Sequence, residues 1–197
     1  MPRDREFDID AVTERALRAF WAQGYEATSM ETLLATMGIG RGSFYATFGG
    51  KRELLHASLR RYDREYRSVA LGRASAGRSP RAAILAIFAS MIDGSRGPDS
   101  RHGCFLVNSA LELAPTDAEV RRIVRAGFAD IARVFADLVR RGQEAGTMGR
   151  AIGPEALGMA LMSQLVGLLV LVRARAPRPA LEAVVGTVER LLDCTRP

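Results

Sequence analysis

Residues 24–54 read GYEATSMETLLATMGIGRGSFYATFGGKREL, and the order of glycines and apolar residues in this stretch predicts how the fold begins. One short helix is predicted through Leu33, Leu34 and Met37, and a second from about Arg41 to Phe48. Gly38 stands between them, and a residue without a Cβ lets the chain reverse without strain. Gly49 and Gly50 break the second helix, after which Lys51 begins a longer one. The stretch therefore predicts two short helices joined by a tight turn and followed by a third helix.

An amphipathic helix precedes this stretch, because apolar residues from position 7 to position 20 recur at the spacing of one helical face. Asp8 and Asp10 are acidic residues of the kind that favour a helix start, and Gly24 is a suitable stop. Thr28 and Glu31 have the spacing of a capping box, so we expect Thr28 to cap the helix that follows. These helices predict a compact tri-helical unit in the first 50 residues.

The helix at residues 41–48 has the features of a helix that reads DNA. It presents a cation and small side chains near its N-terminal end, where a helix in the major groove meets the base edges. The start of the preceding helix offers free N–H groups and hydroxyls, which suit a phosphate oxygen. The candidate base-reading residues are Arg41, Gly42, Ser43, Ala46 and Thr47, and the candidate phosphate contacts are Thr28 and Ser29.

Several motifs in this order resemble the DNA-binding domain of the TetR family of repressors. They are Ala16-Leu17-Arg18-Ala19-Phe20, Gly24-Tyr25, Ala27-Thr28-Ser29-Met30, Met37-Gly38-Ile39, Gly42-Ser43-Phe44-Tyr45 with Phe48, and Lys51 with Glu53 and Leu54. The resemblance covers about residues 7–62. It implies that Tyr45 and Lys51 also hold the DNA backbone. The segment at residues 103–110 is similar to one found in a subset of the family, and it assigns no ligand.

The rest of the chain predicts further helices and no strand, so we expect an all-α fold. A Gly-, Ser- and Ala-rich loop at residues 72–80 and a polar loop at residues 94–103 separate the helices. Thr116 and Glu119 form a second capping box. We divide the chain into a helix-turn-helix DNA-binding domain at residues 1–50, a linking helix at residues 51–71, and a ligand-binding and dimerisation domain at residues 72–197.

Two helices near the C-terminus predict a homodimer. Residues 156–172 are apolar on nearly every face, and such a helix must be buried. With residues 180–194 it would form half of a four-helix bundle about a two-fold axis. A symmetric dimer suits a palindromic DNA operator.

The same domain offers apolar and aromatic side chains for an effector pocket, with two amides as polar anchors. The candidate lining residues are Phe88, Met91, Phe105, Asn108, Leu111, Phe128, Ile131, Phe135, Met162 and Gln164. Each of them taken singly is better explained as ordinary core, since such side chains at helical spacing usually pack, and the family resemblance is what favours the pocket as a whole. A pocket of this kind would take a small apolar or aromatic effector, whose binding selects a state that releases DNA.

The composition indicates which kind of partner and which cellular location to expect. The net charge of +6 suits an anionic partner, and basic residues concentrate between Arg41 and Arg81. The most apolar run, at residues 165–172, is shorter than a membrane span of about 20 residues. With no secretion signal either, we expect a cytoplasmic protein. His102 and Cys104 are too few for a metal site, which needs three or four ligands, although a redox or metal-sensing role stays open.

An enzyme is not expected, because no group stands where acid–base or nucleophilic chemistry would need it, and no cofactor motif is present. Two other interpretations stay open. One is a helical protein-binding adaptor without DNA affinity. The other is a DNA-binding regulator without a small-molecule ligand, which could activate transcription instead of repressing it.

Overall fold

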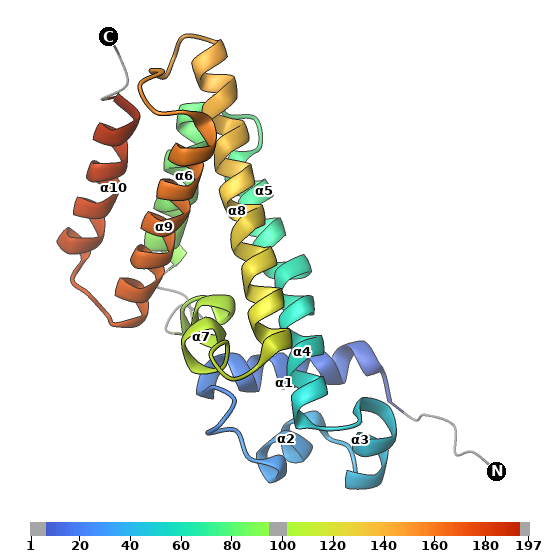
Figure 1. The fold of residues 1–197 in the computed structure, drawn as a ribbon. Coiled ribbons are helices and arrows are strands. Elements are labelled where there is room, and N and C mark those ends of the chain that lie inside the picture. The colour runs from blue at the N-terminus through green and yellow to red at the C-terminus, as the bar shows by residue number, and fades with distance from the viewer. Residues whose placement is uncertain (1–6, 95–101, 194–197) are drawn as a thin grey trace. The chain divides into compact units, whose positions relative to one another are not determined.

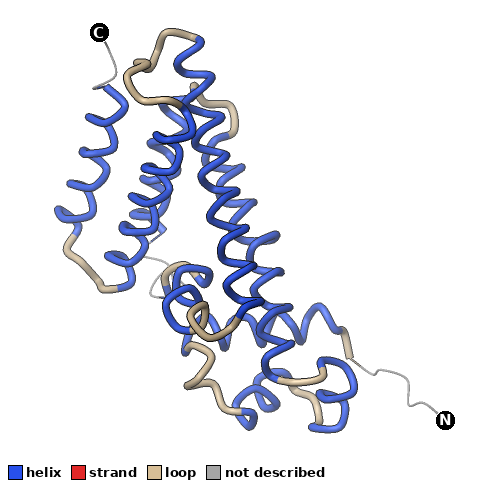
Figure 2. Tube along the Cα trace, in the orientation of Figure 1, coloured by secondary structure: helices blue, strands red, loops and turns tan. Residues whose placement is uncertain are grey.

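The structure, a computed structural model, describes residues 7–94 and 102–193, and these are helical with connecting turns (Figures 1 and 2). A π-helical turn, η1 (Asp63–Arg67), separates two of the α-helices. The helices are α1 (Ile9–Gln23), α2 (Met30–Met37), α3 (Arg41–Phe48), α4 (Lys51–Tyr62), α5 (Ser68–Ser75), α6 (Pro80–Gly94), α7 (Phe105–Glu112), α8 (Ala118–Glu144), α9 (Pro154–Arg173) and α10 (Arg178–Asp193). The predicted all-α class is confirmed.

The helices form two compact units. The first unit comprises Met1–Tyr66 and Cys104–Val124, and the second comprises Arg67–Gly103 and Arg125–Pro197. The division predicted from the sequence places everything after residue 72 in one C-terminal domain. In the structure α7 and the start of α8 belong instead to the first unit, with the N-terminal helices.

The first unit is built around α1, which packs against α2 and α4. Its fully buried apolar side chains are Val12, Ala16, Leu17, Phe20, Leu33, Met37, Phe44, Leu54, Leu59, Leu106 and Val120. The ring of Phe105 on α7 meets the ring of Tyr62 on α4 edge to face, with 5.8 Å between the centroids. Aromatic pairs of this geometry are favourable beyond the area they bury, so α7 is anchored in this unit.

The second unit packs α10 against α6 and α9, and α9 against α6 (Figure 1). Phe88 of α6 and Phe135 of α8 are fully buried and stack with 5.8 Å between ring centroids. Gly158 lies where α9 meets α8, and a Cβ on it would come within 2.7 Å of the Ala132 carbonyl oxygen. The lack of a side chain at this position therefore lets the two helices touch along their backbones.

Most helix starts agree with the sequence, but both predicted capping boxes were wrong by one residue. Ser29, not Thr28, caps α2, and its hydroxyl accepts the Thr32 N–H at 3.0 Å. Asp117, not Thr116, caps α8, where its Oδ1 accepts the N–H groups of Glu119 and Val120 at 2.9 and 3.0 Å. In each of the pairs Thr28-Ser29 and Thr116-Asp117, the side chain of the second residue reaches the free N–H groups at the helix start.

Two connections also differ from prediction. The expected loop at residues 72–80 is shorter, because α5 continues through Ser75 before the chain turns into α6 at Pro80. The last helix begins at Arg178, two residues earlier than expected, so Pro179 lies inside its first turn, where proline is tolerated. Most of the predicted loop at residues 94–103 lies outside the described residues.

By length and composition α9 could cross a membrane, a property that the eight-residue run at 165–172 does not reveal. Its buried residues are those of one helical face, among them Leu157, Leu161, Leu165 and Leu168. This face lies in the hydrophobic core of the second unit. The core helix of a soluble protein can have the length and composition of a span, so the buried face accounts for part of the apolar character of α9.

Candidate nucleic-acid interface

The turn between α2 and α3 is fixed by backbone geometry and by one arginine. Gly38 ends α2 in the left-handed conformation, with φ 70°, and its N–H donates to the Leu34 carbonyl at 2.9 Å. A side chain in this conformation would be strained, so glycine is the suitable residue. The Arg15 guanidinium of α1 donates to the Met37 carbonyl at 2.7 Å. These contacts satisfy the last carbonyls of α2 and set the direction in which α3 leaves.

Helix α3 buries one side chain and exposes the others. Phe44 is fully buried, whereas Arg41, Gly42, Ser43 and Ala46 are exposed and Thr47 is half-buried. Among the described residues Arg41 has no hydrogen-bonding or ion-pair partner. The structure thus places the five predicted base-reading residues on one short helix, with a single aromatic anchor behind them.

Tyr45 and Lys51, the residues that the resemblance implies for the DNA backbone, are also accessible. Tyr45 is 47% exposed, and its ring meets Phe44 edge to face with 5.2 Å between centroids. Lys51 begins α4, and its Nζ lies 4.2 Å from the centroid of the Tyr25 ring. A cation above an aromatic face is held by a cation–π interaction, so Lys51 has a preferred position. This role of Tyr25 was not predicted from the sequence.

Thr28 does not fit the predicted role of a phosphate contact. Its side chain is fully buried, and its hydroxyl donates to the Gly24 carbonyl at 2.5 Å. A hydroxyl that is engaged inside the turn has no surface to offer a phosphate. Ser29 beside it is exposed, so the start of α2 presents Ser29 and the backbone N–H groups alone.

Five of the ten basic residues between Arg41 and Arg81 form ion pairs within their own unit. In the first unit Arg52 and Arg60 pair with Asp117 and Glu119, at 2.7 and 2.8 Å. Arg61 pairs with three carboxylates, those of Asp10, Glu14 and Glu65. In the second unit Arg67 and Arg81 pair with Asp130 and Asp193, at 3.7 and 3.1 Å. Half of the basic residues in the stretch are therefore paired inside the protein, and Arg41 and Lys51 are the cations of the candidate interface.

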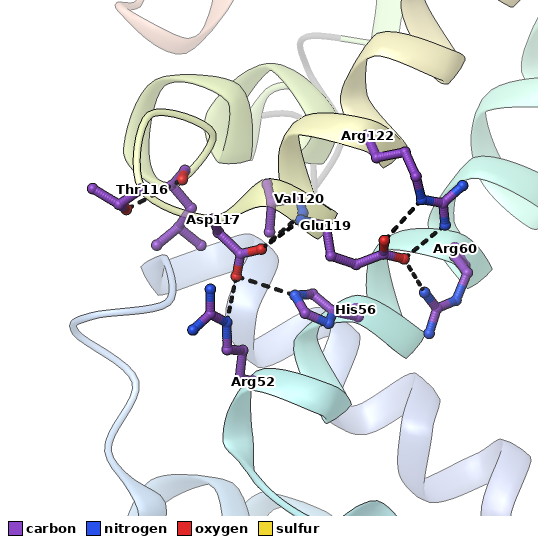
Figure 3. Close-up of polar contacts among 9 residues, drawn as sticks. Arg52, His56, Arg60, Thr116, Asp117, Glu119, Val120 and Arg122 are labelled. Atoms are coloured by element: carbon purple, nitrogen blue, oxygen red, sulfur yellow. Dashed lines mark hydrogen bonds and ion pairs between the residues drawn. The ribbon is translucent and has the colours of Figure 1, made fainter.

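Asp117 is the centre of the polar contacts that join α4 to the start of α8 (Figure 3). Its Oδ2 accepts from Arg52 Nε at 2.7 Å and lies 3.1 Å from His56 Nε2. Burial by itself raises the pKa of Asp117, but hydrogen bonds from the Val120 N–H, Arg52 and His56 outweigh it. The pKa of this carboxyl is consequently held well below its usual range, and the carboxylate stays charged.

The predicted effector-lining residues fall in both units. Phe88, Ile131 and Phe135 are buried in the core of the second unit, and Met91, Phe128 and Met162 pack against it. Gln164 is half-buried there. Phe105, Asn108 and Leu111 belong to the first unit. Leu111 is 72% exposed, which does not fit the wall of an apolar cavity, so we withdraw it from the candidate set.

The second unit also has a groove that the sequence did not predict. Its volume is about 420 Å³, and it is lined by residues of η1, α5 and α8, including Arg67, Ser68, Asp130 and Arg133. None of the predicted effector-lining residues contributes to it. Cys104 is buried. The described residues contain no group of three or more His, Cys, Asp or Glu side chains arranged for a metal ion.

Two short helices joined by a glycine turn, with an exposed second helix, define the class of helix-turn-helix DNA-binding proteins. Comparison with known proteins gives the family. Residues 12–58 match the family described as bacterial regulatory proteins, tetR family, and residues 80–188 match the tetracyclin repressor-like C-terminal domain. The chain therefore belongs to the TetR family of DNA-binding transcriptional regulators. This confirms the resemblance, and it excludes both an enzyme and the adaptor interpretation.

Individual relatives agree with this assignment. The structure is similar to that of a cysteine-substituted form of the TetR family regulator CifR complexed with 26 bp double-strand operator DNA, with a TM-score of 0.84 and 29% identity over 96% of this chain and 99% of that one. The repressor ComR of Escherichia coli is 27% identical over 96% of this chain and 90% of its own. The uncharacterised regulator YezE of Bacillus subtilis is 37% identical over 62% of this chain and 63% of its own.

Proposed function

We propose that this protein is a homodimeric repressor that binds a palindromic operator through α3 and is released by a small apolar or aromatic effector. The exposed face of α3, with an unpaired Arg41 among small side chains, carries the proposal. As a DNA-binding regulator it would act in the cytoplasm. The alternative in the same class is a regulator that has no small-molecule ligand.

In the proposed interface the base contacts come from α3, and the phosphate contacts come from α3, from the start of α4 and from the start of α2. Arg41, Gly42, Ser43, Ala46 and Thr47 would face the base edges, where glycine and alanine permit close approach of the α3 backbone. Tyr45, Lys51, Ser29 and the N–H groups at the start of α2 would hold phosphates. Likeness to an operator-bound regulator supports this arrangement.

The binding experiment is fluorescence anisotropy with a duplex from the intergenic region upstream of the protein's own gene, over a salt series. We expect Arg41→Ala to weaken binding by about tenfold, because a base contact is worth about 1–3 kcal/mol. Arg64→Ala removes the same charge from an exposed position outside the interface and should leave affinity nearly unchanged. Equal weakening in both variants would contradict a specific role for α3.

The proposed dimer would use the outward faces of α9 and α10. The exposed positions of α9 include Ala156, Ala160, Ser163 and Gly167, at helical spacing, flanked by Met159 and Val170, which are 51% and 41% exposed. The Ser163 hydroxyl donates to the carbonyl of Met159 within its own helix, at 3.0 Å. On α10, the Thr187 hydroxyl likewise donates to Ala183, at 2.9 Å. Such a face presents mainly apolar surface, which a second copy would bury in a four-helix bundle.

Gly167 provides a direct test of this interface. A Cβ at Gly167 would meet nothing within 4 Å in its own chain, and the same holds for Gly72 in α5. We expect Gly167→Arg to shift the protein from dimer to monomer in light-scattering chromatography, because it places a charge in an apolar interface. Gly72→Arg should remain dimeric. A wild-type chain that is monomeric at tens of micromolar would refute the proposal.

The effector site is proposed between α6, α8 and α9, among the second-unit candidates. Phe88 and Phe135 fill this core, so an effector would have to displace side chains such as those of Met91 and Met162, which are only partly buried. Flexible methionine side chains adapt readily to a new neighbour.

The test screens indole, naphthol and benzoate for release of DNA in the anisotropy assay. A compound that releases wild-type protein but not Met162→Phe, whose larger ring would occupy the space, supports the site. Release that is unchanged in Met162→Phe would place the effector elsewhere. No release by any aromatic probe would favour the alternative without a ligand.

A further inference from the structure

The loop between α1 and α2 is held by a carboxylate from a distant part of the sequence. Glu112, the last residue of α7, accepts the N–H of Tyr25 at 3.2 Å and the N–H of Glu26 at 2.9 Å. All of these residues belong to the first unit. A carboxylate that accepts two backbone N–H groups forms charge-assisted hydrogen bonds, which are stronger than neutral ones.

The shape of the loop is adapted to this contact. Gly24, next to Tyr25, has φ 89°, and a Cβ on it would lie 3.0 Å from the Glu112 Oε2 atom. A side chain at this position would be strained by the backbone conformation and would crowd the carboxylate. Glycine at position 24 therefore lets Glu112 reach the N–H groups that follow.

Tyr25, whose backbone N–H donates to Glu112, is also the residue whose ring contacts the Lys51 ammonium. The Tyr25 ring lies below the Lys51 Nζ, at 4.2 Å from the ring centroid. A continuous set of contacts thus leads from the Glu112 carboxylate to the Tyr25 backbone, through the Tyr25 ring, to the Lys51 ammonium. Lys51 is the only lysine of the chain, and it begins α4, where the helix dipole disfavours a cation. Its placement therefore depends on partners outside its own helix.

We infer that Glu112 and Tyr25 are positioning residues for DNA binding, which hold the Lys51 ammonium where it meets a phosphate. This inference rests on the proposed role of Lys51 as a backbone contact. Glu112 itself touches no DNA in this scheme. It acts through Tyr25, and it makes the end of α7 part of the DNA-binding apparatus.

Whether Glu112→Gln weakens or strengthens DNA binding distinguishes a positioning role of Glu112 from simple electrostatic repulsion. Removing a negative charge from a DNA-binding unit ordinarily strengthens binding, because fewer acidic groups repel the phosphates. If Glu112 positions Lys51, Glu112→Gln should weaken binding instead, by about threefold to tenfold, because a hydrogen bond that holds the loop is lost. Glu26→Gln is the matched control, since Glu26 is an exposed carboxylate in the same loop whose side chain has no hydrogen bond or ion pair among the described residues.

The experiment is a double-mutant cycle in the anisotropy assay, with salt dependence measured for each variant. We expect Lys51→Ala to weaken binding and to lower the salt slope by about one for each phosphate that is no longer neutralised. Glu112→Gln should weaken binding in the wild-type background and have no further effect in the Lys51→Ala background, because residues that act through one interaction are not additive. Tyr25→Leu, which removes the ring, should behave as Glu112→Gln does.

Each alternative outcome has a separate meaning. Normal binding by Lys51→Ala would overturn the proposed backbone contact, and the positioning role with it. Weak binding by Lys51→Ala together with Glu112→Gln equal to Glu26→Gln would overturn the positioning role alone. Weakening by Glu112→Gln that persists in the Lys51→Ala background would show a general structural effect and overturn the positioning role as well. Thermal melts of all variants, with midpoints expected to stay well above the assay temperature, exclude unfolding as the cause of weak binding.

Discussion

The Oδ2 atom of Asp117 lies 2.7 Å from the Nε atom of Arg52, across 65 residues of sequence. The same side chain caps α8 through its other oxygen. One buried carboxylate thus begins a helix and ties that helix to α4 in the first unit. Because Asp117 makes both sets of contacts, a substitution at this position should lower the stability of the first unit.

Asp117→Asn should destabilise the protein by about 1–3 kcal/mol, the usual cost when a buried charged hydrogen-bonding network loses a partner. Asparagine is a good helix cap, so the change reports mainly on Arg52 and His56. Urea denaturation followed by circular dichroism measures the change. Asp137→Asn, at an exposed carboxylate of α8, is the control and should change stability by less than about 0.5 kcal/mol. Equal effects would mean that the contacts of Asp117 contribute little.

Stability should fall in acid, and Asp117 should account for part of the fall. The pKa of Asp117 is lowered in the folded state, and that of an unfolded aspartate is about 3.9. The stabilisation is therefore fully present above about pH 5 and is lost as the pH falls toward the folded-state pKa. The free energies of unfolding of wild type and Asp117→Asn, measured at several values between neutral pH and about pH 3, should converge as the pH falls. A constant difference over this range would show that the carboxylate is not the titrating group.

The observed helix cap Ser29 and the predicted helix cap Thr116 can be compared directly by mutation. Ser29→Ala should cost about 1 kcal/mol of stability, because the Thr32 N–H loses its acceptor. Thr116→Ala should cost less than about 0.5 kcal/mol, since the exposed Thr116 hydroxyl bonds only the Leu113 carbonyl, at 3.3 Å. Chemical denaturation of both variants measures the two values. A larger destabilisation by Thr116→Ala would restore the cap that the sequence pattern predicts.

Gly158→Ala should destabilise the second unit although alanine favours helices. A Cβ at this position would lie 2.7 and 2.8 Å from backbone atoms of Ala132 and Ala136, and crowding of this kind costs about 1–3 kcal/mol. Gly72→Ala is the control, because its Cβ would meet nothing within 4 Å and alanine should gain up to about 1 kcal/mol of helix propensity. Thermal melts should therefore move in opposite directions. If both variants are stabilised, α8 and α9 are not in backbone contact at Gly158.

The local sequence determined the helices of the DNA-binding unit because their signals are local. Asp8 and Gly24 bound α1 as predicted, and the glycines around α3 place its ends at Arg41 and Phe48. Capping, glycine conformations and helical periodicity act within a few residues, so they can be read from neighbouring letters. The class of protein followed from the same stretch.

Only the tertiary structure decided which side chains those helices present and which they use internally. Thr28 and Ser29 are equivalent in a capping pattern, yet burial against the Gly24 carbonyl removes Thr28 from the surface. In the sequence the arginines of α4 belong to the basic stretch that suits an anionic partner. In the structure carboxylates from α1 and α8 neutralise most of them. Glu112 carried no signal at all, because its partners are two backbone N–H groups 86 and 87 residues away. Contacts of this range depend on how the chain packs, and no local pattern in the sequence specifies that packing.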